Sequence, residues 1–403
     1  MQPVLLLILT LTLSGCGGMS AINESIIRLT DAFGADDNAD PPAELIELST
    51  AIKIEKLWDL SVGEGFGGQS VKLGPKIADN KLVVADREGL IQSRDPANGD
   101  LFWEVETDEP IASGPGVGDN SVLFGTSNAK VIALDSTDGS TLWTKQVSSE
   151  VLAVPVSAHG VVVIRTIDGH ISGLDHATGD QIWTYDRTVP PLTLRGVGTP
   201  LIVDDLVIQG YANGKLLALQ IRTGKVKWET SFAKPSGRSE LERLVDIDAD
   251  LSYDDGFIYI ASFQGGLAAL SAQDGEIYWH REDISSSAGT AVTWRYLYVT
   301  DEASDLWKLD QRNGAGLWKQ SELHQRKLTA PVVFKNTVVV GDFEGYIHFL
   351  DQEDGHQLDR IQIGDKPITV PPLVVDDVIY VYGKGGELAA LSVASESVAT
   401  EQP

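Results

Sequence analysis

Asp135-Ser-Thr-Asp-Gly139-Ser-Thr-Leu-Trp143 is one copy of a motif that organises most of this 403-residue chain. A tryptophan follows a glycine by four residues in six copies: Gly99/Trp103, Gly139/Trp143, Gly179/Trp183, Gly224/Trp228, Gly275/Trp279 and Gly314/Trp318. A small residue stands ten positions before each of these glycines: Gly89, Ala129, Gly169, Gly214, Gly265 and Ser304. Copies about 40 to 50 residues apart, each with short alternating apolar runs, are typical of β-propeller blades rather than of helical repeats.

The second copy indicates why these residue types recur. Residues 122–126, 130–134 and 141–143 have the composition of strands and are separated by turn residues. Asp135 can accept hydrogen bonds from backbone amides of its own hairpin, and Gly139 can supply the positive φ that a tight hairpin needs. Trp143 is expected on the next strand, where a large ring fills the wedge between neighbouring sheets.

The number of blades follows from a count of strands. Paired apolar runs occur near eight places: residues 71–86, 112–127, 152–166, 196–210, 249–263, 288–300, 329–342 and 369–382. The last blade has no tryptophan strand after Glu387–Leu391, whereas Lys56–Leu60, which contains Trp58, has no blade before it. We therefore predict an all-β fold over residues 51–394, an eight-bladed β-propeller of four-stranded antiparallel blades. The Trp58 strand pairs with the C-terminal blade and closes the ring, which removes exposed sheet edges.

The N-terminus indicates export. Residues 4–13 are apolar apart from threonines, a stretch too short to span a membrane and typical of a signal peptide, here residues 1–15. Leu13-Ser-Gly-Cys16 resembles the bacterial lipoprotein cleavage box, which implies lipidation of Cys16, the chain's single cysteine. Gly17 after it indicates transport to the outer membrane. An ordinary cleaved signal peptide is the alternative. Met1-Gln-Pro lacks the usual basic residues, from which we expect the true start codon to lie upstream.

Composition is consistent with a chain held at a membrane by lipid alone. There are 31 basic and 58 acidic residues, and the net charge of −27 opposes binding to nucleic acid or to anionic membrane surfaces. Residues 16–50 are interpreted as the lipidated N-terminus and a tether, and residues 395–403 as a C-terminal tail.

No catalytic, cofactor or metal site is predicted. Gly63-Glu-Gly65-Phe-Gly-Gly68 matches a phosphate-binding pattern, but strand-like residues follow it, so we interpret it as a loop. The seven histidines show no metal-binding spacing. Asp246-Ile-Asp248-Ala-Asp250 begins like a calcium loop, but Leu251 and Phe257 occupy the positions that need a glycine and a carboxylate.

The repeat is irregular in two adjacent blades. Successive tryptophans are 45 residues apart from Trp183 to Trp228 and 51 apart from Trp228 to Trp279. Insertions in a propeller lie in loops on its faces, where binding surfaces are built. The residues that we select there as a candidate protein-binding surface are Leu192, Leu194, Arg195, Asp246 and Asp248. Composition leaves a second interpretation open, in which the leucines are inward positions of a strand and the aspartates are turn residues.

Two resemblances bear on function. The Ala/Gly-Leu-Asp-x-x-x-Gly-x-x-x-Trp repeat is similar to that of quinoprotein-like propellers. With the lipoprotein box, Leu192-Thr-Leu-Arg195-Gly and Arg243-Leu-Val-Asp246-Ile-Asp248, the chain from about Trp58 to Leu391 resembles the BamB (YfgL) family of outer-membrane assembly lipoproteins.

The second resemblance implies a non-enzymatic scaffold on the periplasmic face of the outer membrane. It implies docking onto the periplasmic domains of BamA, the barrel-forming subunit of the Bam complex, with unfolded outer-membrane proteins as further candidate partners. By this resemblance, the positions that the family uses for the contact correspond to Leu192, Leu194, Arg195, Asp246 and Asp248. Asp246 and Asp248 would either hold Arg195 in place or accept hydrogen bonds from the partner.

Two other functions remain as alternatives. A dehydrogenase dependent on pyrroloquinoline quinone would share the blade motif, but many such enzymes use a vicinal disulfide against the quinone, and this chain has one cysteine. A lipoprotein propeller that binds a different envelope protein would share all of the physical features and differ only in its partner.

Overall fold

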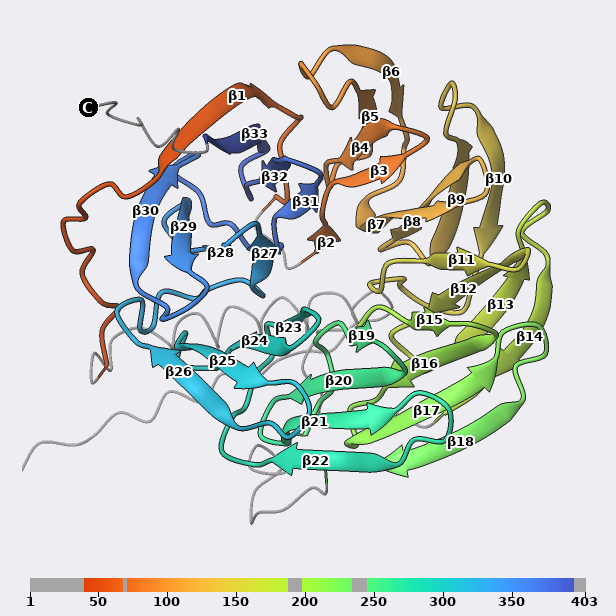
Figure 1. Cartoon of the computed structure of the whole chain (residues 1–403). Helices are drawn as coiled ribbons and strands as arrows, with labels where there is room; N and C mark the ends of the chain where they lie inside the picture. The colour runs from red at the N-terminus through yellow and green to blue at the C-terminus, as the bar shows by residue number, and fades with distance from the viewer. Residues whose placement is uncertain (1–39, 68–70, 188–197, 234–244, 395–403) are drawn as a thin grey trace, which may run out of the picture. The chain divides into compact units, whose positions relative to one another are not determined.

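The computed structural model describes residues 40–67, 71–187, 198–233 and 245–394. Every regular element in these ranges is a β-strand. From Pro42 onwards the chain forms one compact unit, in which eight sheets are arranged around a centre (Figure 1). The predicted eight-bladed propeller is therefore confirmed. The described residues contain no helix of the length and apolarity needed to cross a bilayer.

Each blade runs from an innermost first strand to an outermost fourth strand. The strands of blades 1 to 4 are β3(Lys76–Ala78), β4(Lys81–Ala85), β5(Leu90–Arg94) and β6(Leu101–Glu106); β7(Ile111–Gly118), β8(Ser121–Thr126), β9(Lys130–Asp135) and β10(Thr141–Gln146); β11(Val156–Ala158), β12(Val161–Arg165), β13(Ile171–Asp175) and β14(Gln181–Tyr185); and β15(Leu201–Val203), β16(Leu206–Gly210), β17(Lys215–Gln220) and β18(Val226–Ser231).

Blades 5 to 8 continue the same order. Their strands are β19(Ser252–Asp254), β20(Phe257–Ser262), β21(Gly266–Ser271) and β22(Ile277–Arg281); β23(Thr290–Val292), β24(Tyr296–Thr300), β25(Leu306–Asp310) and β26(Gly316–Gln320); β27(Val332–Phe334), β28(Thr337–Gly341), β29(Tyr346–Asp351) and β30(Gln357–Gln362); and β31(Leu373–Val375), β32(Val378–Tyr382), β33(Glu387–Ala394) and β1(Lys53–Ser61). Second and third strands are almost entirely buried, because each is covered on both faces by neighbouring blades.

The ring closes as predicted. β1, from the N-terminal part of the chain, is the fourth strand of blade 8 and pairs antiparallel with β33, from Lys53 opposite Ala394 to Ser61 opposite Glu387 (Figure 1). The two ends of the propeller therefore share one sheet, and the last blade has no open outer edge at β33.

One short strand departs from the four-stranded pattern. β2(Lys72–Leu73) pairs parallel with β7 and makes the second sheet five-stranded. After β1 the chain must cross from the outside of blade 8 to the centre before blade 1 begins, and there it meets the free inner edge of β7. Residues 63–67 of the glycine-rich segment form turns, so their interpretation as a loop is confirmed.

The repeated tryptophans connect successive blades. The indole N–H of a fourth strand donates to a carbonyl in the hairpin between the third and fourth strands of the next blade. The seven donors, Trp58, Trp103, Trp143, Trp183, Trp228, Trp279 and Trp318, reach Pro96, Ser136, His176, Ile221, Ala272, Gln311 and Gln352 at 2.7–3.3 Å. Each ring also lies against the repeat glycine of that next hairpin.

Gly139 shows why only glycine fits this position. Its φ is 76°, in the left-handed region, and Asp135 caps the same hairpin by accepting the N–H of Thr137 at 2.7 Å. A Cβ on Gly139 would also lie 2.7 Å from the ring of Trp103. The glycine is therefore required by the hairpin and, independently, by the neighbouring blade.

The junction between blades 7 and 8 lacks a tryptophan. Asp359 stands at the tryptophan position, and Ile52, Ile54, Ile361 and Val393 pack around a buried apolar cluster there. The N–H of Ala51 donates to the carbonyl of Leu358 in β30 at 3.2 Å. Apolar packing by the N-terminal segment thus takes the place of the indole at the junction where the ring closes.

The two roles of the repeat glycine can be separated by mutation. Gly160 has nearly the same φ as Gly139, 75°, but a Cβ there would meet nothing within 4 Å. We expect Gly160→Ala to cost about 1 to 2 kcal/mol of unfolding free energy from backbone strain alone. Gly139→Ala should cost about 1 to 3 kcal/mol more, because it also forces the Trp103 ring to move. Equal losses in chemical denaturation would show that the indole contact contributes nothing.

Ring closure can be tested at Trp58. Trp58→Ala should lower the free energy of unfolding by about 3 to 5 kcal/mol, because it removes a packed indole and the hydrogen bond to Pro96. Trp294→Ala is the matched control, since that side chain is 82% exposed, and its effect should stay within about 0.5 kcal/mol. Similar melting curves for the two variants would contradict a closing role for Trp58.

Candidate functional site

The two irregular segments leave the propeller on one face. Residues 188–197 connect β14 to β15 and residues 234–244 connect β18 to β19, so each joins the outermost strand of one blade to the innermost strand of the next. In an antiparallel blade these connections lie at the same ends as the hairpins between second and third strands, such as 166–169 and 211–214. We call this side of the propeller the connection face. Leu192, Leu194 and Arg195 lie outside the described residues.

The other two selected residues lie on segment 245–250, which is buried from 245 to 249. Val245 forms a parallel bridge with Asn213 in the hairpin of blade 4, and the carbonyl of Asp246 accepts the N–H of Phe263 at 3.2 Å in blade 5. Ile247 packs so closely on Gly210 that a Cβ there would lie 2.3 Å away. Asp246 and Asp248 are 1% and 8% exposed. They are therefore not ordinary exposed turn residues.

Lys72 and Asp250 hold the far end of this segment. The ammonium of Lys72, on β2, lies 2.8 Å from the carboxylate of Asp250 and 3.3 Å from the carbonyl of Asp248. The same carboxylate accepts the N–H of Thr199 at 2.7 Å, just before β15. The segment is thus attached to the inner parts of blades 2, 4 and 5.

Two arginines enclose a tyrosine next to this segment. The guanidinium of Arg165, at the end of β12, lies 5.1 Å from the ring centre of Tyr211, and that of Arg187 lies 4.9 Å from it. Arg165 donates to the carbonyl of Gly210 at 2.9 Å, whereas Arg187 forms a two-pronged ion pair with Glu229 at 2.9 and 3.3 Å. Both arginines offer planar donor groups, and their faces on Tyr211 add cation–π attraction.

Burial sets the protonation equilibria of this group. Desolvation and, to a smaller extent, the nearby Asp246 raise the pKa of Asp248 from 3.8 to about 7, against the opposing effect of Arg165 and Lys72. Burial also raises the pKa of Tyr211 and lowers that of Arg165. The pKa of Glu229 is lowered by its bonds to Arg187 and Lys215.

Several polar atoms here have no hydrogen-bond partner within the described ranges. They are Arg165 Nε, Thr199 Oγ1, Gln209 Oε1, Tyr211 Oη and Asp248 Oδ2. A buried polar atom without a partner costs about 1 to 3 kcal/mol, so five in one region is an unusual concentration. We call Arg165, Gln209, Tyr211, Asp246 and Asp248 the polar floor.

The side chains of the polar floor can donate and accept hydrogen bonds, so they are suited to holding neighbouring polar groups in place. These donors and acceptors lie at the ends of blades 3 to 5, where the two irregular connections begin and end.

Sequence reasoning missed Arg165, Arg187 and Tyr211. A signal was present, because Arg165 lies near the end of a second strand opposite an apolar residue of the third strand. The other seven blades have small or uncharged residues in the same register: Ala85, Gly125, Gly210, Ala261, Thr300, Gly341 and Tyr382. A charged residue at this position distinguishes the second strand of blade 3 from the second strands of the other blades. Alignment of the second strands, in addition to the tryptophan strands, would have found it.

One group of potential metal ligands occurs among the described residues. Ligand atoms of Asp351, Asp354 and His356 lie within 4.8 Å of one another. These residues belong to the hairpin between β29 and β30, where Asp351 and Asp354 accept backbone N–H groups of Glu353 and His356 as in the other blades. The aspartates therefore have the structural role that the repeat assigns to them.

Comparison with known proteins identifies relatives over nearly the whole chain. A family model described as outer membrane protein assembly factor BamB matches residues 87–320 and 308–399. The chain is 47% identical over 353 residues to the outer membrane protein assembly factor BamB of Pseudomonas aeruginosa, an alignment that covers 88% of this chain and 93% of the relative.

Solved structures give the same result. The crystal structure of BamB from Moraxella catarrhalis matches with a TM-score of 0.77 and 25% identity, over 84% of this chain and all of that one. A europium-containing methanol dehydrogenase matches with a TM-score of 0.70 over 84% of this chain and 93% of the other, but at 12% identity it is similar in fold alone.

The buried carboxyl of Asp248 predicts a specific pH dependence. Between its ordinary pKa of 3.8 and about 7, the folded chain binds more protons at Asp248 than the unfolded chain does. The stability that this proton contributes is fully present below about pH 4 and is lost as the pH rises through 7. Asp248→Asn should therefore be stabilised relative to wild type by an amount that grows between pH 5 and pH 8, on the order of 3 kcal/mol.

Denaturation at the two pH values measures this difference. Asp205→Asn is the control, because Asp205 is exposed, and it should not change the pH dependence. A wild type and an Asp248→Asn variant that lose stability in parallel would show that Asp248 is ionised across the whole range.

Proposed function

The chain belongs to the BamB family of outer membrane protein assembly factors, and from this premise we propose that it is a non-enzymatic scaffold of the β-barrel assembly machinery. In this role it binds the periplasmic domains of BamA and assists the insertion of β-barrel proteins. The relatives are named as assembly factors, and the dehydrogenase likeness extends only to the fold. A ring of blades suits such a role, because it gives a rigid body with large faces.

We place the BamA contact on the connection face over blades 3 to 5. The observation that carries this assignment is the polar floor, which lies where both irregular connections join the ring and concentrates buried polar atoms there. A loop that presents binding residues binds more tightly if it is already held in one conformation, because ordering the loop on binding costs free energy and weakens the affinity. A buried group of both charge signs, close to the described residues where the two connections join the ring, would supply such support.

The selected residues then divide into two roles. Leu192, Leu194 and Arg195 would contact BamA directly, with the arginine offering a planar fork of donors and the leucines apolar area around it. Asp246 and Asp248 would support the loop from the interior of the propeller, because their burial leaves almost no surface for a partner. Of the two roles considered for these aspartates, holding the loop is therefore the one that we propose.

We propose further that lipidated Cys16 holds the protein at the periplasmic face of the outer membrane. Removal of residues 1–15 as a signal peptide would leave Cys16 as the N-terminus. With a net charge of −27, the protein itself would be repelled by anionic lipid, so the acyl chains would supply the attraction.

Capture of purified BamA periplasmic domains tests the assignment. Arg195→Ala should weaken binding about 30-fold, since truncation of a hot-spot arginine costs about 2 kcal/mol. Tyr211→Phe removes one buried oxygen and no carbon, so it should weaken binding about fivefold if that oxygen supports the loops. Surface plasmon resonance measures both, with melting temperature as the check on folding.

Arg295→Ala is the matched control. Arg295 is exposed in the turn between β23 and β24, on the side opposite the connection face, and its loss should leave affinity unchanged. If Arg195→Ala and Arg295→Ala bind equally well, BamA docks elsewhere on the propeller. If wild type does not bind BamA at all, the partner is another envelope protein.

A further inference from the structure

The N-terminal segment 42–52 follows a defined path along blade 7. At its start, the N–H of Ala43 donates to the carbonyl of His324 at 2.9 Å, in the connection between β26 and β27. At its end, Ala51 bonds to Leu358 near the beginning of β30. The first contact is on the connection face and the second is near the opposite face. The predicted tether, residues 16–50, includes Ala43 and Leu45, which contact the propeller.

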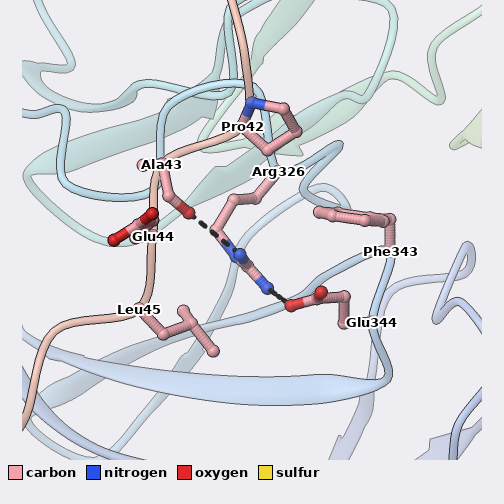
Figure 2. Close-up of a pocket in the computed structure, with 7 residues that line it drawn as sticks. All are labelled: Pro42, Ala43, Glu44, Leu45, Arg326, Phe343 and Glu344. Atoms are coloured by element: carbon pink, nitrogen blue, oxygen red, sulfur yellow. Dashed lines mark hydrogen bonds and ion pairs between the residues drawn. The ribbon is translucent and has the colours of Figure 1, made fainter.

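The first contact is a built pocket. Pro42–Leu45 lies beside Arg326, Phe343 and Glu344, as Figure 2 shows. The guanidinium of Arg326 donates to the carbonyl of Ala43 at 3.0 Å and also contacts Glu344. It lies 5.0 Å from the ring centre of Phe343, and Leu45 packs on a buried apolar cluster of blades 6 and 7.

The arginine is itself fixed from beneath. Two of its nitrogens donate to one oxygen of Asp342 at 2.9 and 2.7 Å, and His348 lies 2.9 Å from the same oxygen. All three side chains are almost completely buried. Burial alone would raise the pKa of Asp342, but His348 and Arg326 outweigh it and hold the pKa below its ordinary value. The donor that holds Ala43 is therefore a permanent part of the core.

We propose that Pro42–Leu45 is a strap that fixes the exit of the lipid tether on the connection face, so that this face is held toward the lipid bilayer. The proposal rests on the proposed lipidation of Cys16. Twenty-four positions separate Cys16 from residue 40, and the flexible tether that we propose for this stretch would have a typical reach of roughly 25 to 30 Å. A tether this short favours the face at which it begins. The proposed BamA surface and the membrane anchor then share one side of the propeller.

Energy transfer to labelled lipid measures which face is nearer. Lipidated protein is bound to phosphatidylcholine vesicles that carry an acceptor dye on the headgroups. A donor dye is attached to Asn128→Cys, in the connection-face hairpin of blade 2, or to Thr137→Cys, in its opposite hairpin. Lipidation blocks the thiol of Cys16, so each sample carries one dye. We expect about twofold more transfer from position 128 than from 137.

Two replacements of equal length isolate the strap. Replacing Pro42–Leu45 by Gly-Ser-Gly-Ser moves the first fixed point of the chain to about Ala51, near the opposite face, so the preference should vanish or invert. Replacing Glu47–Thr50 in the same way leaves the strap in place and should preserve the preference. Arg326 is left unchanged, since its loss would strand Asp342 as a buried charge and unfold the blade.

The outcomes separate this proposal from the proposed function. Equal transfer from positions 128 and 137 in the wild-type chain, or a preference that survives loss of the strap, overturns the strap assignment. Failure of the chain to bind vesicles overturns lipidation alone. In that case, a hexahistidine tag placed at residue 16 and bound to nickel-chelating lipid still reports the face.

Discussion

The contact between an indole of one blade and a glycine hairpin of the next is the interaction on which the rest of this structure depends. A single four-stranded sheet cannot bury both of its faces. Seven of the eight junctions use the same geometry, in which the ring covers the glycine and the indole N–H satisfies a carbonyl. The apolar clusters between second and third strands then become buried as the ring forms. The eighth junction uses aliphatic packing by the N-terminal segment in its place.

Because the indole–glycine contact holds neighbouring blades together, the loops that connect the strands are not needed for this purpose. Where the spacing is regular, the hairpins of the connection face are capped by their own aspartate or threonine, as Asp86 and Thr126 do. In blades 3 to 5 this capping pattern is not kept. Arg165, Tyr211 and Asp248 are buried there instead, and their burial costs free energy of desolvation. Such a cost is typical of a site kept for function, which agrees with the binding role proposed for this face.

The N-terminal segment contributes to the structure twice. Its β1 strand supplies the missing edge of blade 8, and the residues before it run along blade 7 to a pocket built on the buried pair of Arg326 and Asp342. The same stretch of chain that closes the ring therefore also determines where the rest of the N-terminus departs. With the proposed strap, ring closure and orientation at a membrane would both depend on one segment.

The sequence by itself determined the fold class, the number of blades, the closure by the Trp58 strand and the family. These follow from local rules, because hairpin glycines, capping aspartates and alternating apolar runs act within one blade and repeat in a fixed register. It also located the two irregular connections. It did not determine that Asp246 and Asp248 are buried, nor that Arg165 and Tyr211 lie beside them.

Only the tertiary structure decided those points, because the groups involved are distant in the chain and meet through packing. Arg165 reaches Tyr211 across a blade boundary, Lys72 reaches Asp250 from another part of the ring, and Arg326 holds Ala43 across almost 300 residues. No periodicity links such pairs. The direction of each of these side chains depends on the neighbouring sheet or segment rather than on its own sequence.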